Sequence, residues 1–299
     1  MTPATHSPLP AAFDLDSASD TTHERAGIAF VGGGNVARSM IGGLLRQGTA
    51  ATAVSVSEPD IGLRDALAGD FHIATHAGNG DAVTGATIWI LAVKPQVLRS
   101  VCLELASIAQ RTRPLVVTLA AGIPIAAVAR WLAADNDPPP IVRAMPNTPA
   151  LLGAGATALC GNRYVTASQQ QQARALFESV GAAVWVDDET LMDTVTATSG
   201  SGPAYVFALM EAMQAAAQAQ GLPAATARAL IAQTVLGAGR MLVESGEDAA
   251  TLRRRVTSPG GVTEQALRCF AESGFDGLIA RAIGAATARG AELAEQFAR

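Results

Sequence analysis

The 299 residues carry a formal net charge of -5, 49% of them are hydrophobic and only 16% are charged. A chain of this length exceeds what one hydrophobic core usually covers, so we expect two domains. The acidic balance, with no basic run longer than Arg253–Arg255, argues against a nucleic-acid partner. No apolar run reaches the roughly 18 residues that a membrane span needs, so the sequence predicts no membrane partner either.

The first 25 residues and the cysteines indicate the cellular compartment of the protein. Residues 1–25 are rich in Ser, Thr, Pro and Asp and lack the basic start and apolar stretch of a secretory signal. We expect a disordered tail there. Cys102, Cys160 and Cys269 are far apart and form no CxxC pair, which is typical of a reducing compartment and predicts a cytoplasmic protein.

Strands and helices are expected to alternate from Gly27 onward. The segment 27–48 has the pattern of a strand, a glycine turn and a helix. Further strands are expected at 53–59, 71–75, 86–95, 114–123 and 182–188, with helices at 63–69, 97–109 and 125–133. Residues 141–150 are expected to form another strand that runs into a proline-containing loop. The run at 86–95 shows no alternation, as in parallel strands covered on both faces. The pattern predicts a doubly wound parallel sheet in a domain spanning residues 26–188.

After residue 188 the pattern changes to helix alone. Long helices are expected over 201–223 and 224–246, followed by a loop and one or two more helices. Because this second domain, residues 189–299, is poor in large side chains, we expect its helices to interlock with those of a second subunit.

The glycine turn has the spacing of a dinucleotide-binding motif. Residues 32–37, GGGNVA, fit GxGxxG/A between a strand and a helix. Gly32 allows the tight turn and Gly34 lets a pyrophosphate approach the helix N-terminus. Glu58 follows at the end of the next strand, where a carboxylate accepts hydrogen bonds from a ribose and repels a 2′-phosphate, which favours NAD. The alternatives are a turn without a ligand and a Glu58 side chain that points to solvent.

Five segments together resemble the pyrroline-5-carboxylate reductases, which make L-proline with NADPH or NADH. They are FVGGGNVA (30–37), LAVKPQ (91–96), RAMPNTPA (143–150), and the pair SGSGPAYVF (199–207) with VTSPGGVTEQAL (256–267). The resemblance implies a Rossmann domain followed by an all-α dimerisation domain. It also implies a homodimer or an oligomer of dimers, with active sites formed between two subunits.

The resemblance further implies which residues hold the cofactor. The matching positions are Gly34, Asn35 and Val36 at the pyrophosphate, Asn79 at the adenosine, Ala92, Val93, Lys94 and Pro95 along the dinucleotide, and Ala121 and Gly122 near the nicotinamide. Met145, Pro146 and Asn147 match a loop that lines the site in relatives. These segments follow predicted strands, where an open α/β sheet binds its ligands.

The segment TSPGGVTEQAL is expected to bind the substrate. Pro259 presets the chain, Gly260 and Gly261 lack a Cβ, and a helix that begins near Thr263 adds its positive end. Ser258, Gly260 and Gly261 would then hold the substrate carboxylate. Thr263 resembles the family threonine whose hydroxyl reaches the imine nitrogen. The alternative makes Thr263 an N-cap and the glycines an ordinary turn.

Two other functions stay open at this point. A dehydrogenase of the 3-hydroxyacid type usually carries a catalytic lysine in its helical domain, and residues 189–252 contain none. A non-catalytic dinucleotide sensor would keep the fold without the chemistry. No metal is expected, because His72 and His76 have no third ligand nearby in the sequence.

Overall fold

The computed structural model describes residues 27–133 and 137–297 and divides into two compact units. Unit 1 comprises the described residues within 1–200 and 287–299, and unit 2 comprises residues 201–286. The tail expected at residues 1–25 lies outside the described residues.

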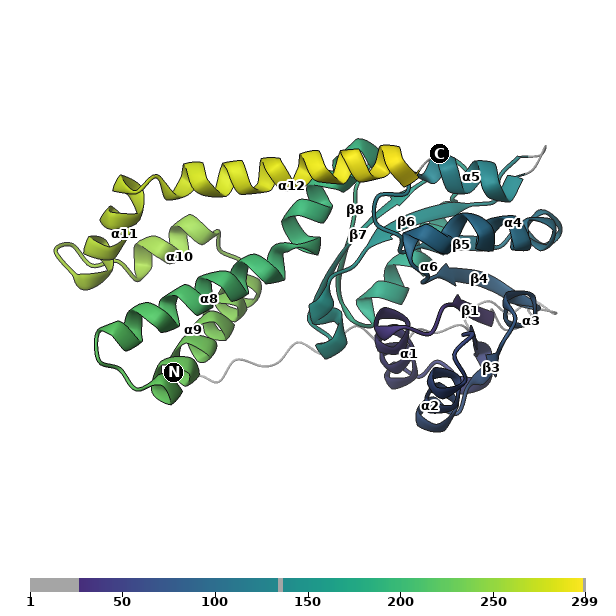
Figure 1. The fold of residues 1–299 in the computed structure, drawn as a ribbon, viewed down its shortest axis with the longest axis horizontal. Coiled ribbons are helices and arrows are strands. Elements are labelled where there is room, and N and C mark those ends of the chain that lie inside the picture. Colours follow the sequence, from purple (N-terminus) through teal and green to yellow (C-terminus); the bar gives the residue numbers. More distant parts are fainter. Residues whose placement is uncertain (1–26, 134–136, 298–299) are drawn as a thin grey trace. The chain divides into compact units, whose positions relative to one another are not determined.

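Eight strands form one sheet in unit 1, in the spatial order β3-β2-β1-β4-β5-β6-β7-β8 (Figure 1). The strands are β1 Gly27–Val31, β2 Val54–Ser57, β3 Ala74–His76, β4 Ala86–Leu91, β5 Leu115–Thr118, β6 Ile141–Met145, β7 Gly155–Gly161 and β8 Gly181–Trp185. Strands β1 to β6 are parallel, whereas β7 is antiparallel to β6 and β8 is parallel to β7. The doubly wound parallel sheet is confirmed, and the reversal at β7 is a feature that the sequence patterns did not predict.

Helices cover both faces of this sheet. They are α1 Asn35–Arg46, α2 Ile61–Phe71, α3 Asn79–Val83, α4 Pro95–Thr112, α5 Ile125–Ala133, α6 Ala167–Glu178 and α7 Met192–Val195. Short 3₁₀-helices lie at η1 Ala51–Ala53, η2 Thr148–Leu152 and η3 Glu189–Leu191, and η4 Thr196–Gly200 is a π-helix. Along β1, Ile28 and Phe30 enter one core cluster with α1 and α6, while Ala29 and Val31 enter the other with α4 and α5. Both faces of β1 are therefore buried, as the continuous apolar run indicates.

The strand expected at residues 71–75 lies further along the chain. Phe71 is the last residue of α2, and His72 adopts a left-handed conformation with φ 56° that ends the helix. The strand β3 then occupies Ala74–His76. The apolar Phe71 side chain belongs to the helix because it packs against the core cluster under α1, so tertiary packing overrides its local strand preference.

An ion cluster ties the end of the sheet to the helices that follow it. Arg143 on β6 is only 5% exposed, and its guanidinium lies 3.1 Å from a carboxylate oxygen of Glu189 and 3.5 Å from one of Asp193. Glu189 also accepts a hydrogen bond of 2.7 Å from the Ile125 N–H at the start of α5. One buried cation thus joins β6, α5, η3 and α7.

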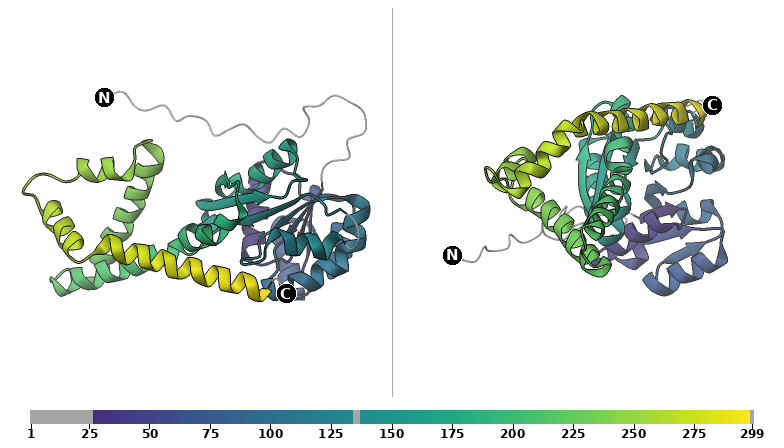
Figure 2. Two further views of the ribbon diagram at one scale, coloured as in Figure 1. Left: turned by 90° about the horizontal axis from the view of Figure 1, so that it is seen from above. Right: turned by 60° about the vertical axis from the view of Figure 1, so that its left-hand side comes forward.

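Unit 2 is built from helices alone (Figure 2), and α8 contacts α9. The helices are α8 Gly202–Ala219, α9 Ala224–Glu244, α10 Ala249–Arg255, α11 Val262–Glu272 and α12 Phe275–Phe297, the last of which continues into unit 1. Across residues 201–286 only Ala227 and Ile231 are buried, while large apolar side chains such as Phe207, Val243 and Leu278 are exposed. Unit 2 therefore has no core of its own and needs apolar surface from elsewhere to cover it.

Among the described residues, no helix is both long enough and apolar enough to cross a membrane.

Candidate cofactor and substrate site

The turn between β1 and α1 has the backbone that a pyrophosphate needs. Gly32 has φ 101°, and a Cβ there would lie 2.8 Å from the carbonyl oxygen of Ala92, so only glycine fits. Gly34 is the N-cap of α1, has no side chain to cap the helix, and has open space where a Cβ would stand. The N–H groups of the first turn, at Asn35 and Val36, lack intrahelical acceptors and suit an anion.

Glu58 lies against this turn instead of pointing to solvent. One carboxylate oxygen accepts a hydrogen bond of 2.9 Å from the Gly33 N–H, and the other accepts one of 3.1 Å from the Asp60 N–H. The guanidinium of Arg64 donates to the carbonyl oxygens of Glu58 and Pro59. A carboxylate and a cation therefore stand together at the end of β2, next to the glycine turn.

The remaining predicted cofactor residues follow β3, β4 and β5. Asn79 is the first residue of α3, and its side chain contacts Ser57 and Glu104. The segment that follows β4, Ala92 to Pro95, begins with a hydrogen bond of 2.8 Å from the Ala92 N–H to the Val31 carbonyl. Because these strands are parallel, their carboxyl ends share one edge of the sheet.

The last turns of α12 pack beside the end of β5. Gly122 has φ 74°, and a Cβ on it would lie 3.6 Å from the Cβ of Leu293. A Cβ at Gly290 would lie 3.2 Å from the Cβ of Asp193 on α7. The turn that contains Ala121 and Gly122 is therefore partly covered by the end of the chain, a contact within unit 1 that sequence patterns did not predict.

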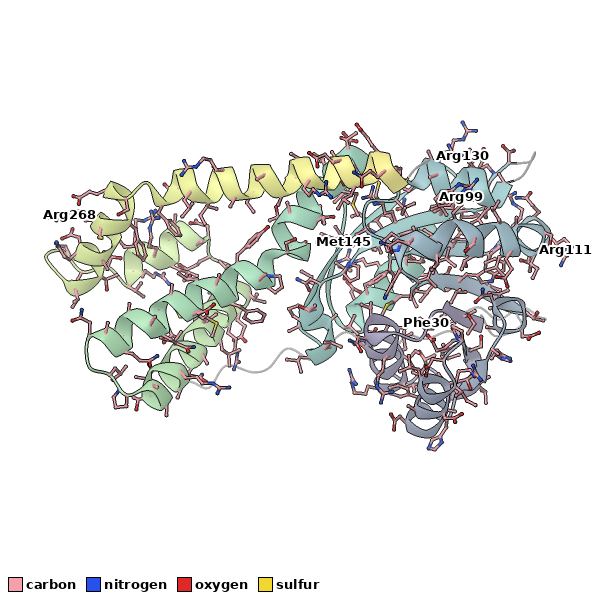
Figure 3. The ribbon with its side chains drawn as sticks, in the orientation of Figure 1. Phe30, Arg99, Arg111, Arg130, Met145 and Arg268 are labelled. Carbon is pink, nitrogen blue, oxygen red and sulfur yellow. The ribbon has the colours of Figure 1, made fainter. Side chains whose placement is uncertain are left out.

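The loop after β6 is held rigidly by the side chain of Asn147. Its amide donates to the Ser199 carbonyl at 3.0 Å and accepts from the Ala156 N–H at 2.9 Å. Met145, labelled in Figure 3, ends β6, and a Cβ at Gly200 would lie 2.6 Å from its terminal methyl group. The loop is thus fastened to η4 and to β7.

The predicted substrate residues lie in unit 2, between α10 and α11. Gly260 has φ 70°, and its N–H donates to a carboxylate oxygen of Glu264 at 2.8 Å. The Gly261 N–H donates to the Ser258 carbonyl at 3.0 Å. Both glycine N–H groups therefore already have acceptors, and Glu264, in the first turn of α11, is a partner of this loop that the sequence reasoning missed.

The start of α11 still offers donors for an anion. Gly261 is the N-cap and carries no side chain that could accept from the first turn. The N–H groups of Val262 and Thr263 therefore have no capping acceptor on Gly261. The Thr263 side chain is exposed.

The structure brings the predicted cofactor residues together at one edge of the sheet in unit 1. Ser258, Gly260, Gly261 and Thr263 form one loop and helix start in unit 2. Among the residues that the structure describes, no group of three or more His, Cys, Asp or Glu side chains is arranged to hold a metal ion.

Comparison with known proteins matches both units. A family model described as pyrroline-5-carboxylate reductase dimerisation matches residues 189–293, and one described as NADP oxidoreductase coenzyme F420-dependent matches residues 27–122. The pyrroline-5-carboxylate reductase of Pseudomonas aeruginosa is 48% identical over 270 residues, covering 90% of this chain and 97% of that protein.

Solved structures show the same likeness. That of a pyrroline-5-carboxylate reductase from Coxiella burnetii has 39% sequence identity and a TM-score of 0.86, covering 90% of this chain and 98% of that one. The fold is also shared with a Plasmodium falciparum pyrroline carboxylate reductase solved with NADP bound, at 24% identity and a TM-score of 0.77, covering 91% of this chain and 100% of that one. This chain therefore belongs to the pyrroline-5-carboxylate reductase family.

Proposed function

We propose that the protein reduces L-1-pyrroline-5-carboxylate to L-proline with NADPH or NADH, the last step of proline biosynthesis. The observation that carries this proposal is the likeness to the Pseudomonas aeruginosa reductase, which is 48% identical over 90% of this chain. A match of that length has to include both the glycine turn of unit 1 and the loop before α11. The carboxyl edge of the sheet supports the same reading, because its glycine turn leaves room for a pyrophosphate.

The cofactor would be held by the strand ends of unit 1. Gly32, Gly34, Asn35 and Val36 would receive the pyrophosphate, with Glu58 and Asn79 at the adenosine, Ala92 to Pro95 along the dinucleotide, and Ala121 and Gly122 near the nicotinamide. The bound cofactor supplies the hydride for the imine carbon. The residues of this chain orient it and provide backbone donors at the helix start.

The substrate would bind at the start of α11. Since the Gly260 N–H has an acceptor in Glu264 of α11 and the Gly261 N–H has one in Ser258, we assign the carboxylate to the N–H groups of Val262 and Thr263. Ser258 to Gly261 shape the approach. The Thr263 hydroxyl orients the ring by a hydrogen bond at its nitrogen, which it donates to the neutral imine and accepts from the N–H of the iminium. A threonine is a weak acid, so the substrate reacts as its iminium or takes a proton from water as hydride arrives.

The decisive assay follows cofactor absorbance at neutral pH with L-1-pyrroline-5-carboxylate, with NADH and NADPH tested in parallel. Oxidation of either cofactor with proline as the product supports the reductase. A protein that binds NADH and shows no turnover with this imine would be a dinucleotide sensor. Turnover with 3-hydroxy acids in its place would assign it to that class of dehydrogenase.

Replacing Glu58 by glutamine is expected to shift cofactor preference toward NADPH. The substitution keeps the size and one acceptor and removes the charge that repels a 2′-phosphate, beside the cation of Arg64. We expect the ratio of kcat/KM for NADPH over NADH to rise about tenfold, which is about 1.4 kcal/mol and slightly more than two like charges about 4 Å apart produce in bulk water. An unchanged ratio in parallel kinetic assays would show that Glu58 does not determine the preference between NADH and NADPH.

The protein is proposed to work as a homodimer or an oligomer of dimers, with each active site shared between two subunits. The exposed apolar side chains of unit 2 and the match to a dimerisation model support this arrangement. Residues 26–188 would form the nucleotide domain of one subunit and residues 189–299 the helical domain of its mate.

Mixing two inactive variants tests this sharing. Gly32→Val blocks the cofactor turn, since even a Cβ at this position meets the Ala92 carbonyl at 2.8 Å, and Thr263→Val removes the hydroxyl. In shared sites, a mixed dimer holds one site with both changes and one with neither. We expect coexpression to restore activity in about a quarter of all sites. Sites made within one chain would stay inactive in the mixture.

A cytoplasmic location is proposed as well. The three cysteines are free thiols, and two of them, Cys102 and Cys160, are buried. Burial raises the pKa of the Cys102 thiol to about 12. Burial, together with the nearby negative charge of Glu189, also raises the pKa of Cys160. Buried thiols of this kind fit a reducing compartment.

A further inference from the structure

Three side chains from different elements form a hydrogen-bond relay at the carboxyl edge of the sheet. The Ser57 hydroxyl at the end of β2 donates to the Asn79 amide oxygen at 2.8 Å. The Asn79 amide nitrogen donates to a carboxylate oxygen of Glu104 on α4, also at 2.8 Å. Ser57 is 1% exposed and Asn79 is half-buried, whereas Glu104 lies on the surface.

The direction of this relay is determined by its outer end. A carboxylate accepts hydrogen bonds and donates none, so Glu104 requires the NH₂ group of Asn79 on its side. The amide oxygen of Asn79 then faces Ser57, whose hydroxyl must donate. With the amide turned over, its oxygen would face the Glu104 carboxylate without a proton between them. Glu104 thus sets the orientation of a side chain on another helix.

The relay is attached to the glycine turn through the backbone of β2. The Ser57 carbonyl accepts a hydrogen bond of 2.9 Å from the Gly32 N–H, and the next residue, Glu58, accepts from the Gly33 N–H. Asn79 therefore stands beside the part of the sheet edge where a dinucleotide places its adenosine half.

The fixed amide keeps one donor and one acceptor for a ligand. The NH₂ group of Asn79 has two protons and its oxygen has two lone pairs, and the relay uses one of each. A ribose hydroxyl, or the edge of an adenine ring, can both donate and accept. The set orientation decides which atom of Asn79 meets which group of the ligand.

We propose that Ser57 and Glu104 are positioning residues, which hold the Asn79 amide in the orientation that recognises the adenosine half of the cofactor. This inference rests on the proposed dinucleotide-dependent function. It assigns a role to Glu104, which lies outside every glycine or strand-end motif of the chain. Neither residue touches the reacting atoms, so both act on affinity and leave the chemical step alone.

The test compares Ser57→Ala and Glu104→Gln with the wild-type protein. A glutamine at 104 can donate as well as accept, so it no longer dictates how the amide turns. We expect the Kd for NADH, measured by its fluorescence, to rise about tenfold in each variant. KM for the cofactor rises with it, while kcat and KM for the imine change less than about twofold.

Cofactor fragments separate positioning from general damage to the fold. ADP-ribose carries the adenosine half and the second ribose without the nicotinamide ring and should lose affinity in both variants, whereas nicotinamide mononucleotide, which lacks the adenosine half, should bind as it does to the wild type. The double variant should bind ADP-ribose no more weakly than the weaker-binding single variant, because both changes break the same relay.

Ser55→Ala is the matched control. Ser55 lies two residues earlier on β2, and its hydroxyl donates to the Ala82 carbonyl of α3 at 2.6 Å without contacting Asn79. We expect its ADP-ribose affinity to stay within about twofold of the wild type. Equal losses of ADP-ribose affinity in Ser55→Ala and Ser57→Ala would contradict the proposed role of the relay. Normal ADP-ribose binding by Glu104→Gln would contradict it as well. Glu104 is exposed, so that variant leaves folding intact.

The outcomes also separate this inference from the proposed function. If the protein binds NADH, the variants lose affinity as expected and pyrroline-5-carboxylate is not reduced, the role of the relay is supported and the reductase function is contradicted. If the protein reduces the imine and all variants bind ADP-ribose normally, the reductase function is supported and the role of the relay is contradicted.

Discussion

Replacing Thr263 by valine is expected to lower kcat for pyrroline-5-carboxylate reduction about 100-fold, with KM for the substrate changed only a few-fold. Valine has the same shape and keeps the N–H of α11 in place, so the change removes one hydroxyl from the imine nitrogen. Thr263→Ser, which restores the donor, should recover most of the turnover. The measurement is steady-state kinetics with saturating cofactor.

Thr257→Val supplies the control in the same loop. The Thr257 hydroxyl already donates to the Arg253 carbonyl at 2.7 Å, so its loss should leave kcat within about threefold of the wild type. An unchanged kcat in Thr263→Val would remove the threonine from the mechanism while leaving the reductase activity itself intact.

Replacing Arg143 by methionine is expected to destabilise the protein by about 3 kcal/mol, because Glu189 and Asp193 then lose the cation that faces them. We take the lower end of the range for a broken buried pair, since the two carboxylates keep 29% and 21% of their side-chain surface exposed. The measurement is urea unfolding at one fixed protein concentration, because a dimer's stability depends on concentration.

Arg174→Met is the matched control on the surface. Arg174 and Glu178 form an ion pair across one turn of α6, with side chains 56% and 42% exposed. Its loss should cost no more than about 0.5 kcal/mol. Similar losses in the two variants would mean that the buried cluster around Arg143 contributes no more than an ordinary surface pair.

The cofactor edge could be predicted from the sequence because its signals are local. The glycine turn lies between one strand and the following helix, and the acidic residue lies at the end of the next strand. The local backbone favours these residue types at these positions. Gly32 shows that reason directly, since even one Cβ would meet the Ala92 carbonyl. Parallel strands then bring the other predicted segments to the same edge.

The strand β7 and the helix α6 were missed for a physical reason. The sequence of β7, GATALCG, consists mainly of small residues with weak strand preference. Its place in the sheet comes from pairing with the strands before and after it, β6 and β8, and the local pattern of β7 does not record that pairing. The helix had one readable signal, the capping box formed by Thr166 and Gln169, ahead of a polar run with few buried residues.

The contacts of Glu264, Ser57 and Glu104 could not be predicted from patterns at all. Each depends on a side-chain rotamer and on a partner in another element or turn. Sequence spacing predicts where a loop begins a helix, as it does for α11, and says nothing about which carboxylate reaches the Gly260 N–H. The role of a residue at such a position can be inferred only from the three-dimensional structure.

The packing of α12 against unit 1 affects the order in which the protein can fold during synthesis. Domains usually fold as they emerge, the N-terminal one first. Here Gly122 and Asp193 pack against the turns of α12 around Leu293 and Gly290, which are synthesised after all of unit 2. The nucleotide unit can therefore complete its packing only after unit 2 has been synthesised, although the strands of its sheet were all made before unit 2.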